Sequence, residues 1–182
     1  MSTSLTEPRT PAAASATGPA AGTLPAPLSA EELAAWRGLL CAHAMLVKAL
    51  DAELEAAHGF PLSSFEALEA LASASGRRLR MCELAERARL SRSGLTRLAD
   101  RLERAGLIER VDCASDARGS FAVLTAAGTA VLAAAGPTYA DVIRRRLLDQ
   151  LSEADLARLG RVCERVLEAS PAREARGSGC CA

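Results

Sequence analysis

Aromatic residues, lysine and histidine are all scarce in this chain of 182 residues. Aromatics make up 3% of it, there are two histidines, and Lys48 is the single lysine among 22 basic residues. With so few rings, a core has to form from alanine and leucine, which favours packing of helix against helix. The formal net charge is zero, so affinity for a polyanion would have to come from the distribution of charge.

Motifs that carry chemistry are also missing. The sequence has no HExxH, P-loop, GxSxG or Cys-x-x-Cys pattern, and the vicinal pair Cys180-Cys181 is not a tetrahedral zinc site by itself. We therefore predict no enzymatic activity, no cofactor and no metal. No apolar run approaches the roughly 18 residues of a membrane span, so we expect no membrane partner.

The two ends of the chain have the composition of tails. Residues 1–28 are rich in alanine, proline, threonine and serine, and they lack the basic start and leucine-rich middle of a secretion signal. We predict a disordered tail over 1–28, a flexible tail over 170–182 and a cytoplasmic location.

The chain between these tails begins and ends with helical patterns. Ser29 can cap a helix that ends at Gly59, and its apolar positions follow a 3.5-residue seam, which is typical of helices that pack against other helices. After Thr125 a long helix runs to about Leu151, with Gly136-Pro137 expected to bend or interrupt it. Ser152 then caps a final helix. The seam of the first helix is Leu33, Trp36, Leu40, His43, Val47, Leu50 and Leu54.

The middle of the chain carries two short helical patterns separated by a tight turn. The first covers residues 81–88 and the second 91–106, where Leu95, Leu98 and Leu102 fall on one face. Arginines and small hydroxyls on the opposite face suit the DNA major groove. An ordinary solvated, arginine-rich helix is the alternative. The predicted DNA-facing residues are Ser91, Arg92, Ser93, Thr96, Arg97 and Arg101.

A hairpin pattern follows this second helix. Residues 107–111 and 121–124 are expected to be strands, with a polar turn over 112–120 that places Arg110, Asp116 and Arg118 in a wing. Together the elements of 60–125 predict a winged helix-turn-helix. Between Arg77 and Arg118 there are eleven arginines against seven acids, and a local excess of this kind marks a DNA-facing side.

These motifs together resemble the MarR family of bacterial transcription regulators. The resemblance lies in Leu84-Ala85-Glu86, the run from Ser91 to Ile108, Asp116-x-Arg118, and Leu124-Thr125-x-x-Gly128. It implies a mainly α fold with a small β hairpin, in which residues 29–59 and 126–169 are dimerisation helices. It further implies a homodimer on a pseudo-palindromic DNA operator, acting as a repressor that a small aromatic ligand releases.

The resemblance leaves the means of control open. By position Trp36, Arg37, His43 and Phe65 could line a ligand cleft, although Trp36 and Phe65 suit a dimer core better and His43 suits a core or interface position. A cytosolic protein keeps thiols reduced, which argues against structural disulfides.

Cysteine chemistry offers the alternative switch. We expect Cys41 and Cys163 to be buried, whereas Cys113 in the wing is expected to be exposed between Arg110 and Arg118, which favours its thiolate. A redox-sensing regulator is therefore an alternative to ligand control. A winged-helix protein-interaction module without DNA binding is another.

Overall fold

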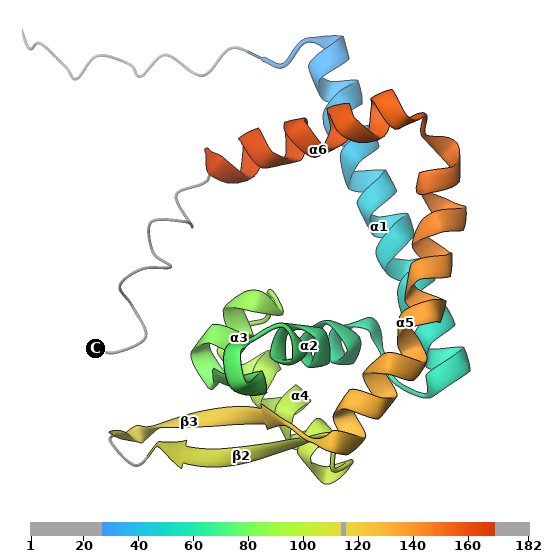
Figure 1. The fold of residues 1–182 in the computed structure, drawn as a ribbon. Helices are drawn as coiled ribbons and strands as arrows, with labels where there is room; N and C mark the ends of the chain where they lie inside the picture. The colour runs from blue at the N-terminus through green and yellow to red at the C-terminus, as the bar shows by residue number, and fades with distance from the viewer. Residues whose placement is uncertain (1–26, 114–115, 170–182) are drawn as a thin grey trace, which may run out of the picture.

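The computed structural model describes residues 27–113 and 116–169, and the side chains of residues 113–119 lie outside that description. Helices dominate, with one small antiparallel sheet (Figure 1), so the predicted fold class is confirmed. In chain order the elements are α1 (Ala30–His58), α2 (Leu62–Ala72), the 3-10 turn η1 (Ser75–Arg77), β1 (Arg78–Arg80), α3 (Met81–Arg87), α4 (Arg92–Arg104), β2 (Ile108–Cys113), β3 (Asp116–Leu124), α5 (Ala126–Arg146), the 3-10 turn η2 (Leu148–Gln150) and α6 (Glu153–Glu168).

Helices α1 and α5 lie side by side and form the stalk of the molecule (Figure 1). Ser29 and Glu32 make a capping box at the start of α1, and Gly59, with φ of 72°, ends it as predicted. Only the C-terminal part of α1 is buried, where Leu50 and Leu54 pack with Ala135, Val142 and residues of α2. The stalk therefore packs against α2 at the C-terminal end of α1.

Helices α2, α3 and α4 with the three strands form a lobe at that end of the stalk (Figure 1). Its core is built almost entirely from leucine and alanine, which the low aromatic content of the chain predicted. The predicted helix face is confirmed, since Leu95, Leu98 and Leu102 of α4 are all buried. The buried core of the lobe also includes Leu68, Leu71, Leu79, Leu84, Ala85, Ala99, Ile108, Ala122 and Leu124.

The sheet has three strands in the order β1-β3-β2, rather than the two of the predicted hairpin. The extra strand is β1, which pairs antiparallel with β3 so that Leu79 lies opposite Ala122. Three residues, Arg-Leu-Arg, are too short for alternation to reveal a strand. Both hairpin strands are also longer than predicted and extend into the segment expected to be a turn.

Pro137 does not interrupt α5, so of the two outcomes predicted for Gly136-Pro137, a bend or an interruption, the interruption is excluded. The helix runs from Ala126 to Arg146 with Pro137 inside it, and it leaves the sheet obliquely before running beside α1 (Figure 1). Tertiary packing maintains the helix here, because Ala135 and Val142, on either side of the proline, are buried against α1 and α2. The predicted caps at Thr125 and Ser152 are both present.

Large apolar surfaces remain uncovered on α1 and α6. Trp36 is 52% exposed, Val166 of α6 is 64% exposed, and no residue of α6 is buried. By length and hydropathy alone α1 could cross a membrane, contrary to our prediction, since an 18-residue window of it has mean hydropathy 1.3 and is 6% buried. A helix that packs against a second subunit meets the same test, and composition alone is weak evidence for a span.

Candidate nucleic-acid interface

Helix α4 begins at a turn that is exposed to solvent. Ser91 is its N-cap, and the Ser91 hydroxyl accepts a hydrogen bond from the Gly94 amide at 3.1 Å. The same hydroxyl lies 3.3 Å from that of Ser93. A capped helix N-terminus presents amide groups and a positive dipole end, which suit a phosphate or the edge of a base.

The exposed face of α4 carries the side chains that the sequence singled out. Arg92, Ser93, Thr96 and Arg97 are all exposed, and the Thr96 hydroxyl donates to the Arg92 carbonyl at 3.0 Å. Neither the Arg92 guanidinium nor the Arg97 guanidinium makes a hydrogen bond or ion pair with any described residue. Their guanidinium groups are therefore free within the described part of the chain to meet an external partner.

The Arg101 side chain, unlike those of Arg92 and Arg97, is bonded to another residue of the lobe. Its guanidinium donates to the Ser64 hydroxyl in α2 at 3.3 Å, and Ser64 is the buried polar residue of the described core. A buried hydroxyl without a partner would be destabilising, so this bond gives Arg101 a structural role. The sequence did not reveal it, because nothing local connects residues 37 positions apart.

Arg110 is also turned inward, toward α4. Its guanidinium donates to Asp100 at 2.5 Å and to the Thr96 carbonyl at 3.3 Å, and its backbone amide donates to Glu103 at 3.2 Å. Arg110 Nε lies 3.6 Å from Glu103 Oε2, an ion pair too long for a hydrogen bond. Arg110 thus fastens β2 to α4.

The wing residues Asp116 and Arg118 lie in β3, but their side chains are outside the described part of the structure, as is that of Cys113. The backbone places Cys113 opposite Asp116, beside a register shift at Asp112. Their predicted contacts with DNA or oxidant therefore stay predictions.

A second basic cluster lies on the solvent face of the sheet, and sequence reasoning missed it. The guanidinium carbons of Arg78 and Arg80 lie 5.1 and 5.4 Å from the centre of the Phe121 ring, within cation-π range. Arg77 donates from the preceding turn to Thr129 of α5 at 3.3 Å. Once β1 is recognised as a strand, the i, i+2 spacing of Arg78 and Arg80 places both on one face.

The predicted ligand-cleft residues do not come together within one chain. Trp36, Arg37 and His43 are exposed on the N-terminal half of α1, while Phe65 is buried beside Leu50. Trp36 and Leu50 are about 20 Å apart along the helix axis. Within a single chain these four residues cannot contact one small ligand.

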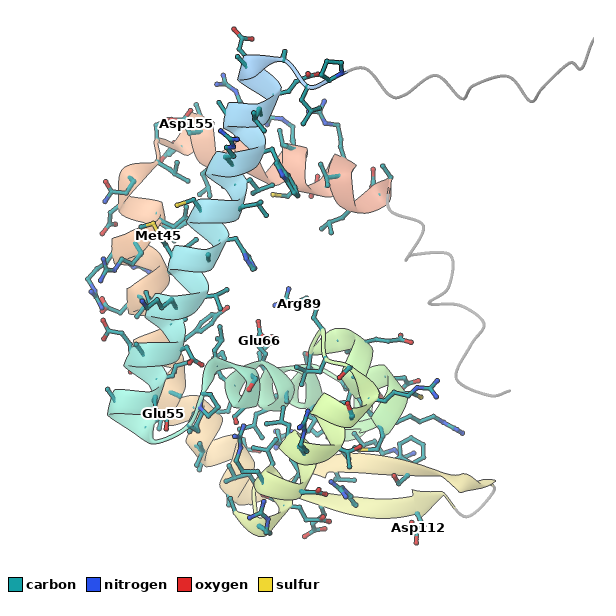
Figure 2. The ribbon with its side chains drawn as sticks, turned by 180° about the vertical axis from the view of Figure 1, so that it is seen from behind. Met45, Glu55, Glu66, Arg89, Asp112 and Asp155 are labelled. Carbon is teal, nitrogen blue, oxygen red and sulfur yellow. The ribbon has the colours of Figure 1, made fainter. Side chains whose placement is uncertain are left out.

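Phe65 instead stacks on Tyr139 of α5, with ring centres 4.4 Å apart. Directly after Phe65 in α2, Glu66 is ion-paired with Arg89 (Figure 2). Burial, with help from the carboxylates of Glu66 and Glu69, raises the pKa of Tyr139, although Arg89 acts in the opposite direction. The phenol is therefore a neutral hydrogen-bonding group at the junction between lobe and stalk.

The cysteines differ from expectation at three positions. Cys41 and Cys163 are exposed free thiols in this single chain, not buried ones, because the helix faces that carry them have no partner here. Cys82, in α3, is disulfide-bonded, which contradicts the expectation that structural disulfides would be absent. Among the described residues no group of three or more metal-ligating side chains gathers.

Comparison with known proteins agrees with this geometry. The profile of the MarR family matches residues 58–119. Sco3205 of Streptomyces coelicolor, a MarR family transcriptional regulator solved in complex with DNA, is 39% identical, with a TM-score of 0.75 over 80% of this chain and 91% of that one. AbsC, from the same organism and family, is 32% identical, with a TM-score of 0.72 over 83% and 98% of the chains.

More distant structures share the fold. A MarR mutant from E. coli, solved in complex with operator DNA, is 22% identical, with a TM-score of 0.66 over 75% of this chain and 96% of that one. No curated protein matches the chain in sequence.

Proposed function

The chain belongs to the MarR family of transcription regulators, and from this premise we propose that it is a homodimeric, DNA-binding repressor that acts in the cytoplasm. The observation that carries the proposal is the exposed face of α4. It presents Arg92, Ser93, Thr96 and Arg97 from a capped, solvent-facing helix, and neither arginine is paired with a described residue. The DNA complex of Sco3205, 39% identical, supports the same use of the lobe here.

Each lobe would place α4 in a major groove and the wing, with Asp116 and Arg118, beside the adjacent minor groove. Arginine at the start of α4 can pair with guanine, and the hydroxyls of Ser91 and Thr96 can reach bases or phosphates. Arg101 and Arg110, which the sequence placed in the interface, would contribute mainly by holding α4 against α2 and β2.

A homodimer is supported by the uncovered apolar faces of α1 and α6. The exposed row on α6 includes Leu156, Leu159, Val162 and Val166, and α1 exposes Trp36, Leu40 and Val47 on its predicted seam. The described residues of a single chain leave these rows uncovered, whereas two chains can interlock them. The two recognition helices would then read half-sites of a pseudo-palindrome about 34 Å apart.

Control by a small ligand follows from the way that lobe and stalk meet. The Phe65–Tyr139 stack joins α2 to α5, and a ligand at this junction would release DNA only if it prefers a lobe position that misfits the operator. Trp36, Arg37 and His43 could contact a ligand at this junction only if they came from the other subunit of a dimer.

Control by a thiol is the second candidate. The disulfide of Cys82 lies in the helix directly before the recognition helix, and Cys113 is the redox site predicted from the sequence. A protein-interaction module without DNA binding is less well supported, because a protein partner would not require unpaired arginines at the start of α4.

The deciding experiment is fluorescence anisotropy on the upstream region of the chain's own gene and on a random duplex of equal length. We expect the cognate duplex to bind at least about a thousandfold more tightly at physiological salt. Equal affinity for both duplexes would contradict a sequence-specific regulator. Repeating the titration with aromatic acids and with peroxide separates ligand control from thiol control.

A further inference from the structure

We propose that Thr125 and Gly128 form a rigid joint between α4 and α5, and that this joint sets the spacing of the two recognition helices. The proposal rests on the dimeric DNA-binding function proposed above. Thr125 and Gly128 would act as positioning residues, because they hold the recognition helix in place without touching DNA.

Thr125 binds both carbonyl groups that follow α4. Its hydroxyl lies 2.8 Å from the Gly106 oxygen and 3.0 Å from the Leu107 oxygen, and its backbone amide donates to Leu107 at 3.2 Å. The same hydroxyl accepts from the Gly128 amide at 3.0 Å, which caps α5. One side chain therefore starts α5 and holds the end of α4.

Gly128 allows α5 to approach that end more closely than any other residue could. A Cβ atom at this position would lie 2.2 Å from the Leu107 carbonyl oxygen and 2.7 Å from a methyl carbon of Leu124. Because Leu107 presents backbone here, no side-chain rotation can relieve the clash. The glycine therefore fixes the distance between the first turn of α5 and the chain at Leu107.

The Gly106-Leu107 segment is itself part of the C-terminal cap of α4. Gly106 has a φ of 69°, and the Leu107 amide donates to the Leu102 carbonyl at 2.9 Å. The last turn of α4 and the residue that caps α5 are thus both hydrogen-bonded to the same short segment, Gly106-Leu107. If α5 tilts, the end of α4 has to move with it. The orientation of the stalk therefore determines the orientation of α4, the proposed recognition helix.

Thr125→Val tests the joint, since valine keeps the shape of threonine and its backbone amide but cannot make the hydroxyl bonds to Gly106, Leu107 and Gly128. Thr125→Ser keeps the hydroxyl and should behave like wild type. Thr129→Val is the matched control, because the Thr129 hydroxyl bonds the Thr125 carbonyl and Arg77 but not the end of α4. Gly128→Ala tests the close approach independently.

The first readout needs no DNA. A keto amino acid replaces both Arg104 of α4 and Glu164 of α6, and each copy carries a spin label. Diluting the labelled chain into unlabelled chain leaves one measurable distance, that between α4 and α6 of the same chain. We expect a narrow distribution in wild type, Thr125→Ser and Thr129→Val, and a broad one in Thr125→Val. A narrow distribution in Thr125→Val would overturn the joint, even if Gly128→Ala fails to fold.

The second readout is operator spacing. We expect Thr125→Val to lose roughly tenfold in affinity for the cognate operator, a coupling of ordinary size, while binding random DNA as wild type does. It should also discriminate less against operators with one base pair added between the half-sites. Unchanged spacing preference would overturn the proposal. If wild-type protein shows no cognate preference, the proposed function fails, and the distance measurement still decides the joint.

Discussion

At the scale of single residues, the hydrogen-bond and ion-pair partners of each arginine in the lobe indicate what that arginine does. Arg97 has no hydrogen-bond or ion-pair partner among the described residues, Arg101 donates to Ser64, and Arg110 joins Asp100 and the Thr96 carbonyl. The sequence placed all three on one DNA-facing surface. Helical periodicity shows from which face of a helix an arginine side chain starts. Because that side chain is long, it can still reach a partner on another element.

The first prediction compares Arg97→Ala with Arg118→Ala. If Arg97 meets a base edge, its loss should cost about 1 to 3 kcal/mol on the cognate site and little on random DNA. Arg118, in the wing, should weaken binding to all sequences and reduce the salt dependence by roughly one contact. Anisotropy on both duplexes at several salt concentrations measures these effects. Equal losses for Arg97→Ala on both duplexes would show that it contacts only phosphate.

The second prediction concerns Arg110. Arg110→Ala should lower the free energy of unfolding by about 1 to 2 kcal/mol, because it leaves Asp100 without its charged partner in a half-buried contact. Urea unfolding measures the loss. Arg104→Ala is the matched control, since Arg104 bonds only the Asp100 carbonyl on its own helix. A loss of DNA affinity at unchanged stability would show instead that Arg110 reaches DNA directly.

For the helices and strands, local signals were reliable and long-range ones were not. Ser29, Gly59, Thr125 and Ser152 end or begin helices as predicted, because a cap depends on residues three or four positions away. Strand β1 depends on its pairing with β3, which is distant in sequence, and it was missed for that reason. The packing that carries α5 through Pro137 comes from α1 and α2, so the sequence left a bend and an interruption both open.

The third prediction separates the two roles of Ser91, as helix cap and as DNA-facing residue. Ser91→Ala should destabilise the protein by about 1 kcal/mol through loss of the cap. Ser91→Asp keeps a capping oxygen and should retain stability, but its charge should repel phosphate and weaken DNA binding. Thermal unfolding and anisotropy together test the pair. Full DNA affinity in Ser91→Asp would place the start of α4 away from the DNA backbone.

In the whole molecule, charge and apolar surface are segregated. The lobe holds the excess of arginine, while Glu31, Glu32, Asp51, Glu53 and Glu55 on α1 are among the acids that offset it in a chain of zero net charge. The apolar seam of α1 is predictable from the sequence, but its burial is not. Leu50 and Leu54 are buried within the chain, whereas Trp36 and Leu40 of the same seam are exposed, so the described residues of one chain cover only one end of the seam.

The last prediction follows from the uneven burial of the α1 seam. Deleting residues 1–28 should leave a dimer, because the deletion removes no residue of the seam. Deleting 152–182 removes α6 and should yield monomer or aggregate, since it takes away one of the two apolar rows that the proposed dimer would bury and leaves that of α1 without its counterpart. Sedimentation velocity at micromolar concentration measures both. Leu159→Glu in the full chain is the milder variant, and it should dissociate the dimer while α6 stays helical, because it places a charge in the apolar row. Ala157→Glu, in the same helix, is the matched control. A stable, soluble monomer of the unmodified chain would contradict the assembly, and with it the spacing of two recognition helices on one operator.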